Sequence, residues 1–299
     1  MDFSFVVNAT KPSALRVLQR IRQLVPREGH RLRVWRRSAE ALRENPDYHN
    51  ELDGFDVCDD VAASDMVVTL GGDGTLLSAV RLLQDKLRPL LGINSGSLGF
   101  LTDTPESDVE DAFAKVLDGS YRLDSRMLLE AVHHPHEGEP VRLRGLNDVV
   151  LTHGPLARVI EVSLRVAGTD LGSTLADGVI VATPSGSTAY SLSAGGPIVS
   201  TNLRALILTP INAHTLTMRP LVVAADEGVE VQLLRAASSR VELTLDGGLG
   251  CEVRAGDKII IRSAPQDLQM VVTREVSFYD TLRTKLAWGQ HGMKRRRSD

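Results

Sequence analysis

The sequence predicts an α/β domain followed by an all-β domain, and three observations support this division. Up to about residue 120, apolar runs alternate with stretches whose apolar residues recur at helical spacing. From about residue 121 onward, short alternating or β-branched runs dominate, and turns with Gly, Pro, Asn or Asp separate many of them. The chain has 299 residues, which is long enough for two domains. We therefore expect a parallel sheet with covering helices, followed by a β-sandwich-like domain.

In the first part, strands are expected at 3–7, 31–35, 66–70 and 89–93. Thr10 is placed to cap a helix that has Pro12 in its first turn. Further helices are expected at 75–83 and at about 107–117, while the segment that follows residue 35 is polar up to about Ser64. Ligands of such folds gather at the carboxyl ends of the strands, where two glycine-containing loops would lie.

In the second part, the expected strands are 128–132, 141–143, 149–152, 159–166, 179–183, 206–208, 221–223, 229–234, 241–245 and 258–261. Residues 133–140, which include His133, His134 and His136, indicate a hairpin loop rather than a metal site. The basic tail at 294–297 is expected to be a disordered terminus, with nucleic-acid binding as a weaker alternative.

The bulk composition is that of an ordinary globular protein. Hydrophobic residues make up 42% of the chain, charged residues 24%, and the net charge is −4, so nothing indicates general affinity for nucleic acid or anionic membranes. No apolar run is long enough to span a membrane, and the N-terminus lacks the pattern of a signal peptide. The cysteines, Cys58 and Cys251, show no metal-binding spacing. We expect a cytoplasmic protein without membrane or nucleic-acid partners.

The first chemical motif is Gly71-Gly72-Asp73-Gly74-Thr75, between a predicted strand and a predicted helix. Glycines let a ligand approach the backbone, and the amides at a helix N-terminus favour phosphate. Asp73 is itself negative, so it suits a hydroxyl proton or a metal ion instead. This combination is what phosphoryl transfer to an alcohol requires, although a simple Gly/Asp turn is the alternative. The motif is neither a Walker loop nor a dinucleotide fingerprint.

The second motif is the segment 177–197, where an apolar strand runs into small hydroxyl and glycine residues. Such a segment could close around a flat polar ligand, with Tyr190 as a stacking face. The alternative is a Gly/Ser-rich turn with a core tyrosine.

Together these motifs resemble the NAD kinases in their bacterial form. The matching segments are 71–75, 92–94, 99–101, 146–150, 177–178, 183–197, 214–216, 219–220, 281–283 and 285–286. The first motif is shared with diacylglycerol and sphingosine kinases and, in variant form, with phosphofructokinases, whereas 183–197 is more specific to NAD kinases. A lipid or sugar kinase and a non-enzymatic dinucleotide sensor therefore remain as alternatives.

The resemblance implies transfer of the terminal phosphate of ATP to the 2′-hydroxyl of the adenosine ribose of NAD, giving NADP. Inorganic polyphosphate is a possible alternative donor. It implies a divalent cation, usually Mg²⁺, and a homodimer or homotetramer in which the dinucleotide lies close to a neighbouring subunit. It also divides the chain into an α/β domain at 1–122, a β-rich dinucleotide-binding domain at 123–272, and a C-terminal segment at 273–299 that packs back on the first domain.

By resemblance, Asp73 is the general base, and no metal-binding residue is assigned. The residues implied for the phosphate donor are Gly71, Gly72, Gly74 and Thr75. The residues implied for NAD are Asp73, Gly74, Asn147, Asp148, Arg158, Asp177, Thr188, Ala189, Tyr190, Ser191, Leu192 and Ser193.

Two positions depart from the family pattern. Asp148 stands where the family usually has Glu, which keeps the charge but changes the reach. Leu175 stands where many bacterial members have a basic residue, so another group such as Arg158 would have to supply that contact. His214 and Arg219 match a family signature, and we expect both to make buried structural hydrogen bonds.

Overall fold

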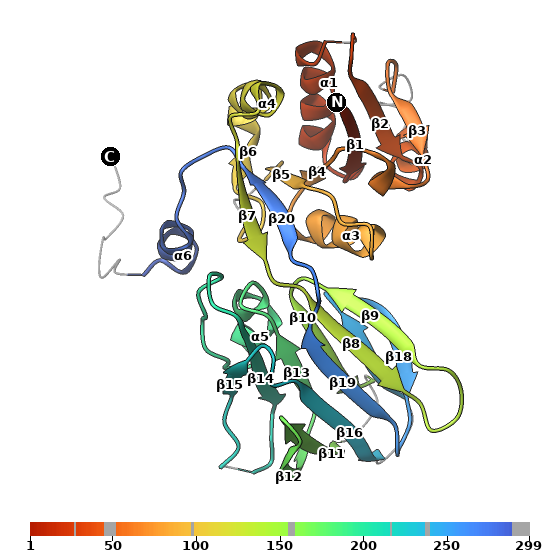
Figure 1. Ribbon diagram of the computed structural model, residues 1–299, viewed down its shortest axis with the longest axis vertical. Coiled ribbons are helices and arrows are strands. Elements are labelled where there is room, and N and C mark those ends of the chain that lie inside the picture. Colours follow the sequence, from red (N-terminus) through yellow and green to blue (C-terminus); the bar gives the residue numbers. More distant parts are fainter. Residues whose placement is uncertain are drawn as a thin grey trace, which may run out of the picture.

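The computed structural model describes residues 1–26, 28–44, 52–96, 99–154, 159–215, 217–236 and 240–288. In this part of the chain an eight-stranded sheet with covering helices lies at one end of the molecule, and two six-stranded sheets lie at the other (Figure 1). The predicted fold class, an α/β domain followed by a β-rich domain, is confirmed. The domain boundaries given above remain predictions.

The first sheet is mostly parallel and has the order β3-β2-β1-β4-β5-β20-β7, with β6 paired to β5. Only the β20–β7 pair among these is antiparallel. Its strands are β1 (Asp2–Val7), β2 (Arg31–Trp35), β3 (Asp56–Cys58), β4 (Met66–Gly71), β5 (Leu90–Asn94), β6 (Thr104–Pro105), β7 (Arg122–Arg126) and β20 (Leu268–Val272).

Helices cover both faces of this sheet. On one face α1 (Pro12–Leu24) and α4 (Val109–Asp118) share a core with the strands, in which Phe3, Phe5 and Phe113 are fully buried. On the other face, α3 (Asp73–Leu83) packs through an apolar stripe that includes Leu76 and Leu83. Full burial of each such side chain contributes about 1.5–3 kcal/mol, so this packing holds the N-terminus of α3 at the end of β4.

The β-rich end consists of two antiparallel sheets, β15-β14-β13-β10-β17-β18 and β12-β11-β16-β19-β8-β9. Their inward-facing apolar side chains form one core, because successive side chains of a strand point to opposite faces. The strands are β8 (Leu129–His134), β9 (Val141–Gly145), β10 (Asp148–His153), β11 (Ile160–Val166), β12 (Thr169–Ala176), β13 (Gly178–Ala182), β14 (Ala205–Ile211), β15 (Leu221–Ala224), β16 (Val229–Ala236), β17 (Val241–Leu245), β18 (Gly248–Val253) and β19 (Lys258–Ser263).

The C-terminal part of the chain returns to the first sheet. β20 lies between β5 and β7, and α6 (Phe278–Leu286) follows it beside the first domain (Figure 1). In the described part of the chain, no helix is long and apolar enough to cross a membrane.

Several local predictions were wrong. The polar segment after β2 contains a helix, α2 (Arg36–Arg43). The N-cap of α1 is Lys11, and Thr10 instead donates to the side chain of Asn8. His133 and His134 lie in β8 rather than in a loop. The edge or late strands β7, β12, β18 and β20 were not predicted.

Candidate active site

The glycine motif lies where β4 turns into α3, as predicted, and Asp73 is the first residue of the helix. A Cβ added at Gly71 would lie 2.1 Å from Thr75 Oγ1, so the turn can be this tight only with glycine. A Cβ added at Gly74 would have no atom within 4 Å. The turn is therefore packed on one side and open on the other, as a phosphate-binding turn needs to be.

The carboxylate of Asp73 is held by the second glycine loop. Its Oδ2 accepts a hydrogen bond from the backbone N–H of Phe100 at 2.9 Å. Its Oδ1 accepts hydrogen bonds from the N–H groups of Leu101 and Thr102 at 3.2 and 3.1 Å, and from Thr102 Oγ1 at 3.0 Å. A Cβ added at Gly99 would lie 1.9 Å from Asp73 Oδ1, so the loop needs glycine to approach. The two loops thus form one unit around Asp73.

Lys11 is a site residue that the sequence analysis missed. Its Nζ lies 3.7 Å from the position of a Cβ at Gly72 and 3.2 Å from that at Gly96, so the ammonium faces both glycine loops. Within the described residues, Lys11 forms no ion pair or side-chain hydrogen bond. The pocket under it is lined by Val6, Val7, Asn8, Lys11, Trp35, Ser38, Gly72, Gly74, Thr75 and Ser78. A cation beside exposed amides favours an anion.

A second group of polar residues lies where β10 begins, at Asn147 and Asp148. The carboxylate of Asp246 accepts the backbone N–H groups of Leu146, Asn147 and Asp148 at 2.8, 2.7 and 3.1 Å. Asp246 has a positive φ of 49°, in the turn between β17 and β18. The sequence analysis missed Asp246, and its only signal was the Asp246-Gly247 turn pair.

The side chains of Asn147 and Asp148 are left without partners by this arrangement. Asn147 Oδ1 is buried and has no hydrogen-bond partner among the described residues. Asp148 is 4% exposed, and no described residue donates to its carboxyl group. Burial, and then the charge of Asp246, raise the pKa of Asp148 to about 7. Both side chains are therefore buried with hydrogen-bonding atoms that no described residue uses.

The segment 183–193 is attached to this group. Thr183 donates from its N–H to Asn147 O at 2.8 Å and from its hydroxyl to Leu146 O at 2.5 Å. A Cβ added at Gly186 would lie 2.0 Å from Asn147 O, so only glycine allows this contact. The structure thus brings the predicted dinucleotide segment against Asn147.

The predicted residues of this segment differ in what their side chains can do. Tyr190 is 46% exposed, Thr188 and Ala189 are partly exposed, and Ser193 is exposed. Ser191 is fully buried and bonds to Thr209 Oγ1 at 2.9 Å, so its side chain serves the fold. Leu192 is partly exposed.

Asp177 is not brought to this group. In the β10–β13 pair, Asp148 lies opposite Ala182 while Thr152 lies opposite Gly178, so Asp177 is at the far end of β13, roughly 15 Å away. Its carboxylate accepts a hydrogen bond from Asn212 Nδ2 at 2.8 Å and lies 3.6 Å from His153 Nε2. Arg158 lies outside the described residues.

Comparisons with known proteins identify the family to which this chain belongs. One family model, the ATP-NAD kinase N-terminal domain, matches residues 3–121, and another, the ATP-NAD kinase C-terminal domain, matches residues 146–273. The chain belongs to the NAD kinase family. The NAD kinase of Geotalea daltonii is 45% identical over 227 residues, which cover 76% of this chain and 80% of that protein. The resemblance found in the sequence is thus confirmed, and the enzyme class is that of the NAD kinases.

Two solved structures show the same fold. Yeast NADH kinase complexed with NADH superposes with a TM-score of 0.88 at 23% identity, over 100% of this chain and 90% of that chain. An NAD kinase from Archaeoglobus fulgidus in complex with ATP gives a TM-score of 0.69 at 24% identity, over 96% of this chain and 99% of that chain.

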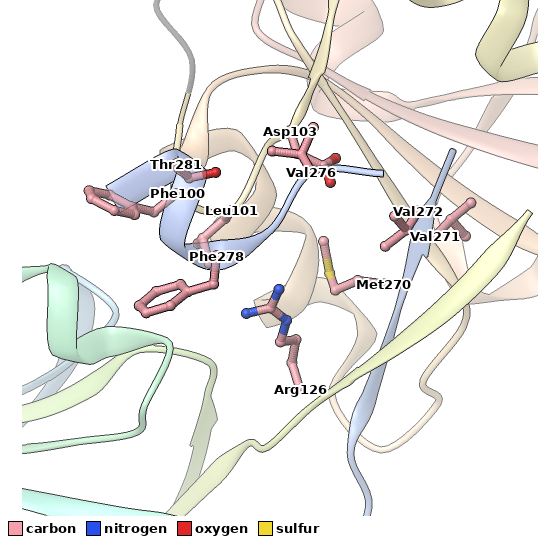
Figure 2. A pocket seen from close by; sticks show the side chains of 10 residues that line it. All are labelled: Phe100, Leu101, Asp103, Arg126, Met270, Val271, Val272, Val276, Phe278 and Thr281. Carbon is pink, nitrogen blue, oxygen red and sulfur yellow. The ribbon is translucent and has the colours of Figure 1, made fainter. Parts of the chain in front are cut away.

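In this member of the NAD kinase family, the C-terminal segments form a wall behind the Asp73 loop. A pocket there is lined by Phe100, Leu101, Asp103, Arg126, Met270, Val271, Val272, Val276, Phe278 and Thr281 (Figure 2). The guanidinium of Arg126 points into the space between Phe278 and Met270 (Figure 2). Burial raises the pKa of the Asp103 carboxyl group at the edge of this wall. The backbone that donates to Asp73 is therefore supported by β20 and α6.

The remaining residues that the sequence analysis considered, which are the histidines of 133–136, His214 and Arg219, lie outside the two groups described above. His133 is buried between Asp257 Oδ2 at 2.9 Å and Cys251 Sγ at 3.3 Å. Among the described residues, no group of three or more His, Cys, Asp or Glu side chains is placed to hold a metal ion. The expectation of buried hydrogen bonds for His214 and Arg219 was wrong, because both residues are exposed.

Proposed function

We propose that this chain transfers the terminal phosphate of ATP to the 2′-hydroxyl of the adenosine ribose of NAD, with Asp73 as the general base. The observation that carries the proposal is the position of Asp73, which lies between two glycine loops and beside a pocket. Lys11 lines this pocket and forms no ion pair within the described residues. ATP in the Archaeoglobus enzyme and NADH in the yeast enzyme support this donor and this class of acceptor.

The donor phosphates are proposed to lie on Gly71, Gly72, Gly74 and Thr75, in the pocket under Lys11. The amides at the start of α3 and the ammonium group of Lys11 favour the negative charge that phosphates bring. The glycines allow the phosphates to approach the backbone closely.

The adenosine part of NAD is proposed to lie against Asn147, Asp148 and the segment 188–193. Asn147 offers an unpartnered amide oxygen to an adenine edge, and Asp148 offers a carboxyl group to ribose hydroxyls. The exposed ring of Tyr190 offers a stacking face, with Thr188, Ala189, Leu192 and Ser193 around it. Ser191 could contribute only backbone atoms, because its side chain is buried.

In the reaction, the ribose 2′-oxygen forms a bond to the terminal phosphorus while the bond from that phosphorus to the bridging oxygen breaks. The hydroxyl proton passes to the carboxylate of Asp73, and ADP leaves. A ribose hydroxyl is a poor nucleophile at neutral pH, so a positioned carboxylate contributes by removing its proton. The remaining task of the site is to align the two substrates and to stabilise the phosphate charge.

A divalent cation, Mg²⁺ in our proposal, fits this donor set. Mg²⁺ at phosphoryl-transfer sites is held largely by substrate phosphates and water, with one or two carboxylates, so no dedicated cage of protein ligands is required. When bound, it would neutralise charge on the donor phosphates. The open side of the turn at Gly74 leaves room for phosphates that carry a cation.

The far position of Asp177 supports a homodimer or homotetramer. Asp177 lies at the opposite end of β13 from Asp148, so one dinucleotide bound at Asp148 does not explain its family motif within a single chain. We propose that Asp177, together with Arg158, contacts the dinucleotide of a neighbouring subunit.

The test is NADP formation from NAD with ATP and Mg²⁺, with the wild type beside Asp73→Asn. We expect turnover by the wild type and little by the variant. If the folded wild type forms no NADP, inorganic polyphosphate is tested as donor. Failure with both donors would contradict the proposal, and NAD binding without turnover would then favour a dinucleotide sensor. Turnover of a diacylglycerol or sphingoid base but not of NAD would favour a lipid kinase.

A further inference from the structure

Thr102 is a buried residue in direct contact with the carboxylate of Asp73. It is 0% exposed, and its Oγ1 lies 3.0 Å from Asp73 Oδ1. Its methyl group packs on the backbone of β5, since a Cβ added at Gly92 would lie 3.0 Å from Thr102 Cγ2. Methyl and hydroxyl groups therefore have separate surroundings, and their roles can be separated by substitution.

The direction of the Thr102 hydroxyl group is fixed by Asn94 at the end of β5. Asn94 Oδ1 accepts the N–H of Gly96 at 2.8 Å, which sets the orientation of the side-chain amide. Asn94 Nδ2 then faces Thr102 Oγ1 at 3.2 Å and must donate to it. Because the hydroxyl oxygen of Thr102 accepts from Asn94, its own proton is directed to Asp73 Oδ1.

The two oxygens of Asp73 are consequently unequal. Among the described residues, Oδ1 receives the N–H groups of Leu101 and Thr102 and the hydroxyl proton of Thr102, whereas Oδ2 receives the N–H of Phe100 alone. A carboxylate oxygen offers about two lone-pair sites, so Oδ1 is saturated and Oδ2 keeps one site open. A hydroxyl group that approaches Asp73 can therefore bond only to Oδ2.

We propose that Thr102 is a positioning residue for Asp73. Its hydroxyl group, oriented by Asn94, gives Oδ1 a third donor and holds the carboxylate so that the proton of the ribose hydroxyl is accepted at Oδ2. This inference rests on the function proposed above and adds to it the oxygen that takes the proton and the residue that selects it. Without the Thr102 hydroxyl, Oδ1 loses its one side-chain donor, and the carboxylate can rotate away from the reacting hydroxyl.

The main test compares Thr102→Val with Thr102→Ser. Valine keeps the size and the methyl contact with Gly92 but lacks the hydroxyl, whereas serine keeps the hydroxyl and lacks the methyl. We expect Thr102→Val to lower kcat for NAD phosphorylation about 10- to 100-fold, and to leave KM for NAD and for ATP within about twofold of wild type. Thr102→Ser should retain most of the wild-type kcat. A structural role alone would not separate the two variants in kcat at constant KM.

A second pair keeps the test decisive if Thr102→Val fails to fold. Thr102→Ala and Thr102→Ser both lack the methyl group and differ only in the hydroxyl, so the serine variant should have the higher kcat by a similar factor. Equal kcat in both pairs would overturn the inference, as would a loss confined to KM. An inactive wild type would instead contradict the proposed function, so the two failures are distinguishable.

Discussion

Two aspartates of the candidate site, Asp73 and Asp148, have opposite surroundings. Asp73 accepts four hydrogen bonds from the loop that follows β5. Asp148 accepts none from the described residues, is almost fully buried, and lies beside a second carboxylate, Asp246. Burial and the nearby negative charge of Asp246 favour the neutral form of Asp148 and raise its pKa. The side chain of Asp73 is therefore fixed in orientation by its donors, whereas the side chain of Asp148 has no donor among the described residues and a pKa raised to about 7.

The difference arises from the backbone around each residue. The amides beside Asp73 point at Asp73 itself, while the amides of Leu146, Asn147 and Asp148 point at Asp246. Asp246 thus stabilises the loop, and Asp148 is left for a ligand that can donate a hydrogen bond. The following predictions test this contrast, from the largest expected effect to the smallest.

Asp73→Asn should reduce kcat for NAD phosphorylation about 10³-fold, since loss of a general base typically removes 10²- to 10⁴-fold. Binding of NAD should change little, because the carboxylate acts on the hydroxyl proton. Steady-state kinetics and calorimetric NAD titration measure the two effects. A variant with near-wild-type kcat would show that Asp73 only holds the loop.

Asp246→Ala should destabilise the protein by about 3 kcal/mol or more, because three backbone amides lose their acceptor. Urea unfolding of the variant beside Asp226→Ala measures this. Asp226 is exposed and serves as the matched control, with an expected change within about 0.5 kcal/mol. If both variants unfold at the same urea concentration, Asp246 does not stabilise the loop.

Asp148→Asn should stabilise the unliganded protein above pH 7 by about 2 to 4 kcal/mol. The pKa of Asp148 is raised from 3.8 to about 7, so the folded state binds its proton more tightly than the unfolded state does. Wild-type stability should therefore fall as the pH rises from about 4 to 7, and this part of the fall should be missing in the variant.

Urea unfolding at several pH values from 4 to 8 gives the comparison. Parallel curves for wild type and Asp148→Asn would contradict the raised pKa. NAD affinity of the variant should fall, because an amide cannot replace the carboxylate as acceptor of two ribose hydroxyls.

Lys11→Ala should raise KM for ATP about tenfold, the loss of one charge-assisted phosphate contact, and leave KM for NAD unchanged. Lys86→Ala is the control, since Lys86 is a surface lysine paired with Asp60. An equal effect of the two substitutions on KM for ATP would place the donor phosphates away from Lys11.

The elements that the sequence predicted well are those whose pattern is local. β11 and β16 alternate buried and exposed residues, and the strand before Asp73 is a continuous apolar run, so periodicity was sufficient. β12 was missed because its side chains are mostly exposed and show no alternation. α2 was missed because only Ser38, Ala39 and Leu42 of its eight residues are buried.

The residues of the candidate site also differ in whether a local sequence pattern predicts them. The glycine motif and the segment 183–197 carry their chemistry in consecutive residues, so the sequence was enough to select them. Lys11 and Asp246 act on backbone groups that lie 61 and about 100 residues away, as does Thr102 on Asp73 over 29 residues. No local pattern encodes such contacts, because they depend on how loops that are distant in the sequence pack together within each domain.

The place of β20 has a consequence for the order in which the protein can be completed. Strands β5 and β7 are separated by the width of one strand, and the chain that fills this space comes from residues 268–272. During synthesis β6 can pair with the end of β5, but the part of β5 at Leu90 that pairs with β20 stays unpaired until almost the whole β-rich domain has been made. The wall behind the Asp73 loop is made of the same late residues, so a nascent or truncated chain that ends before β20 has the glycine motif but not its support.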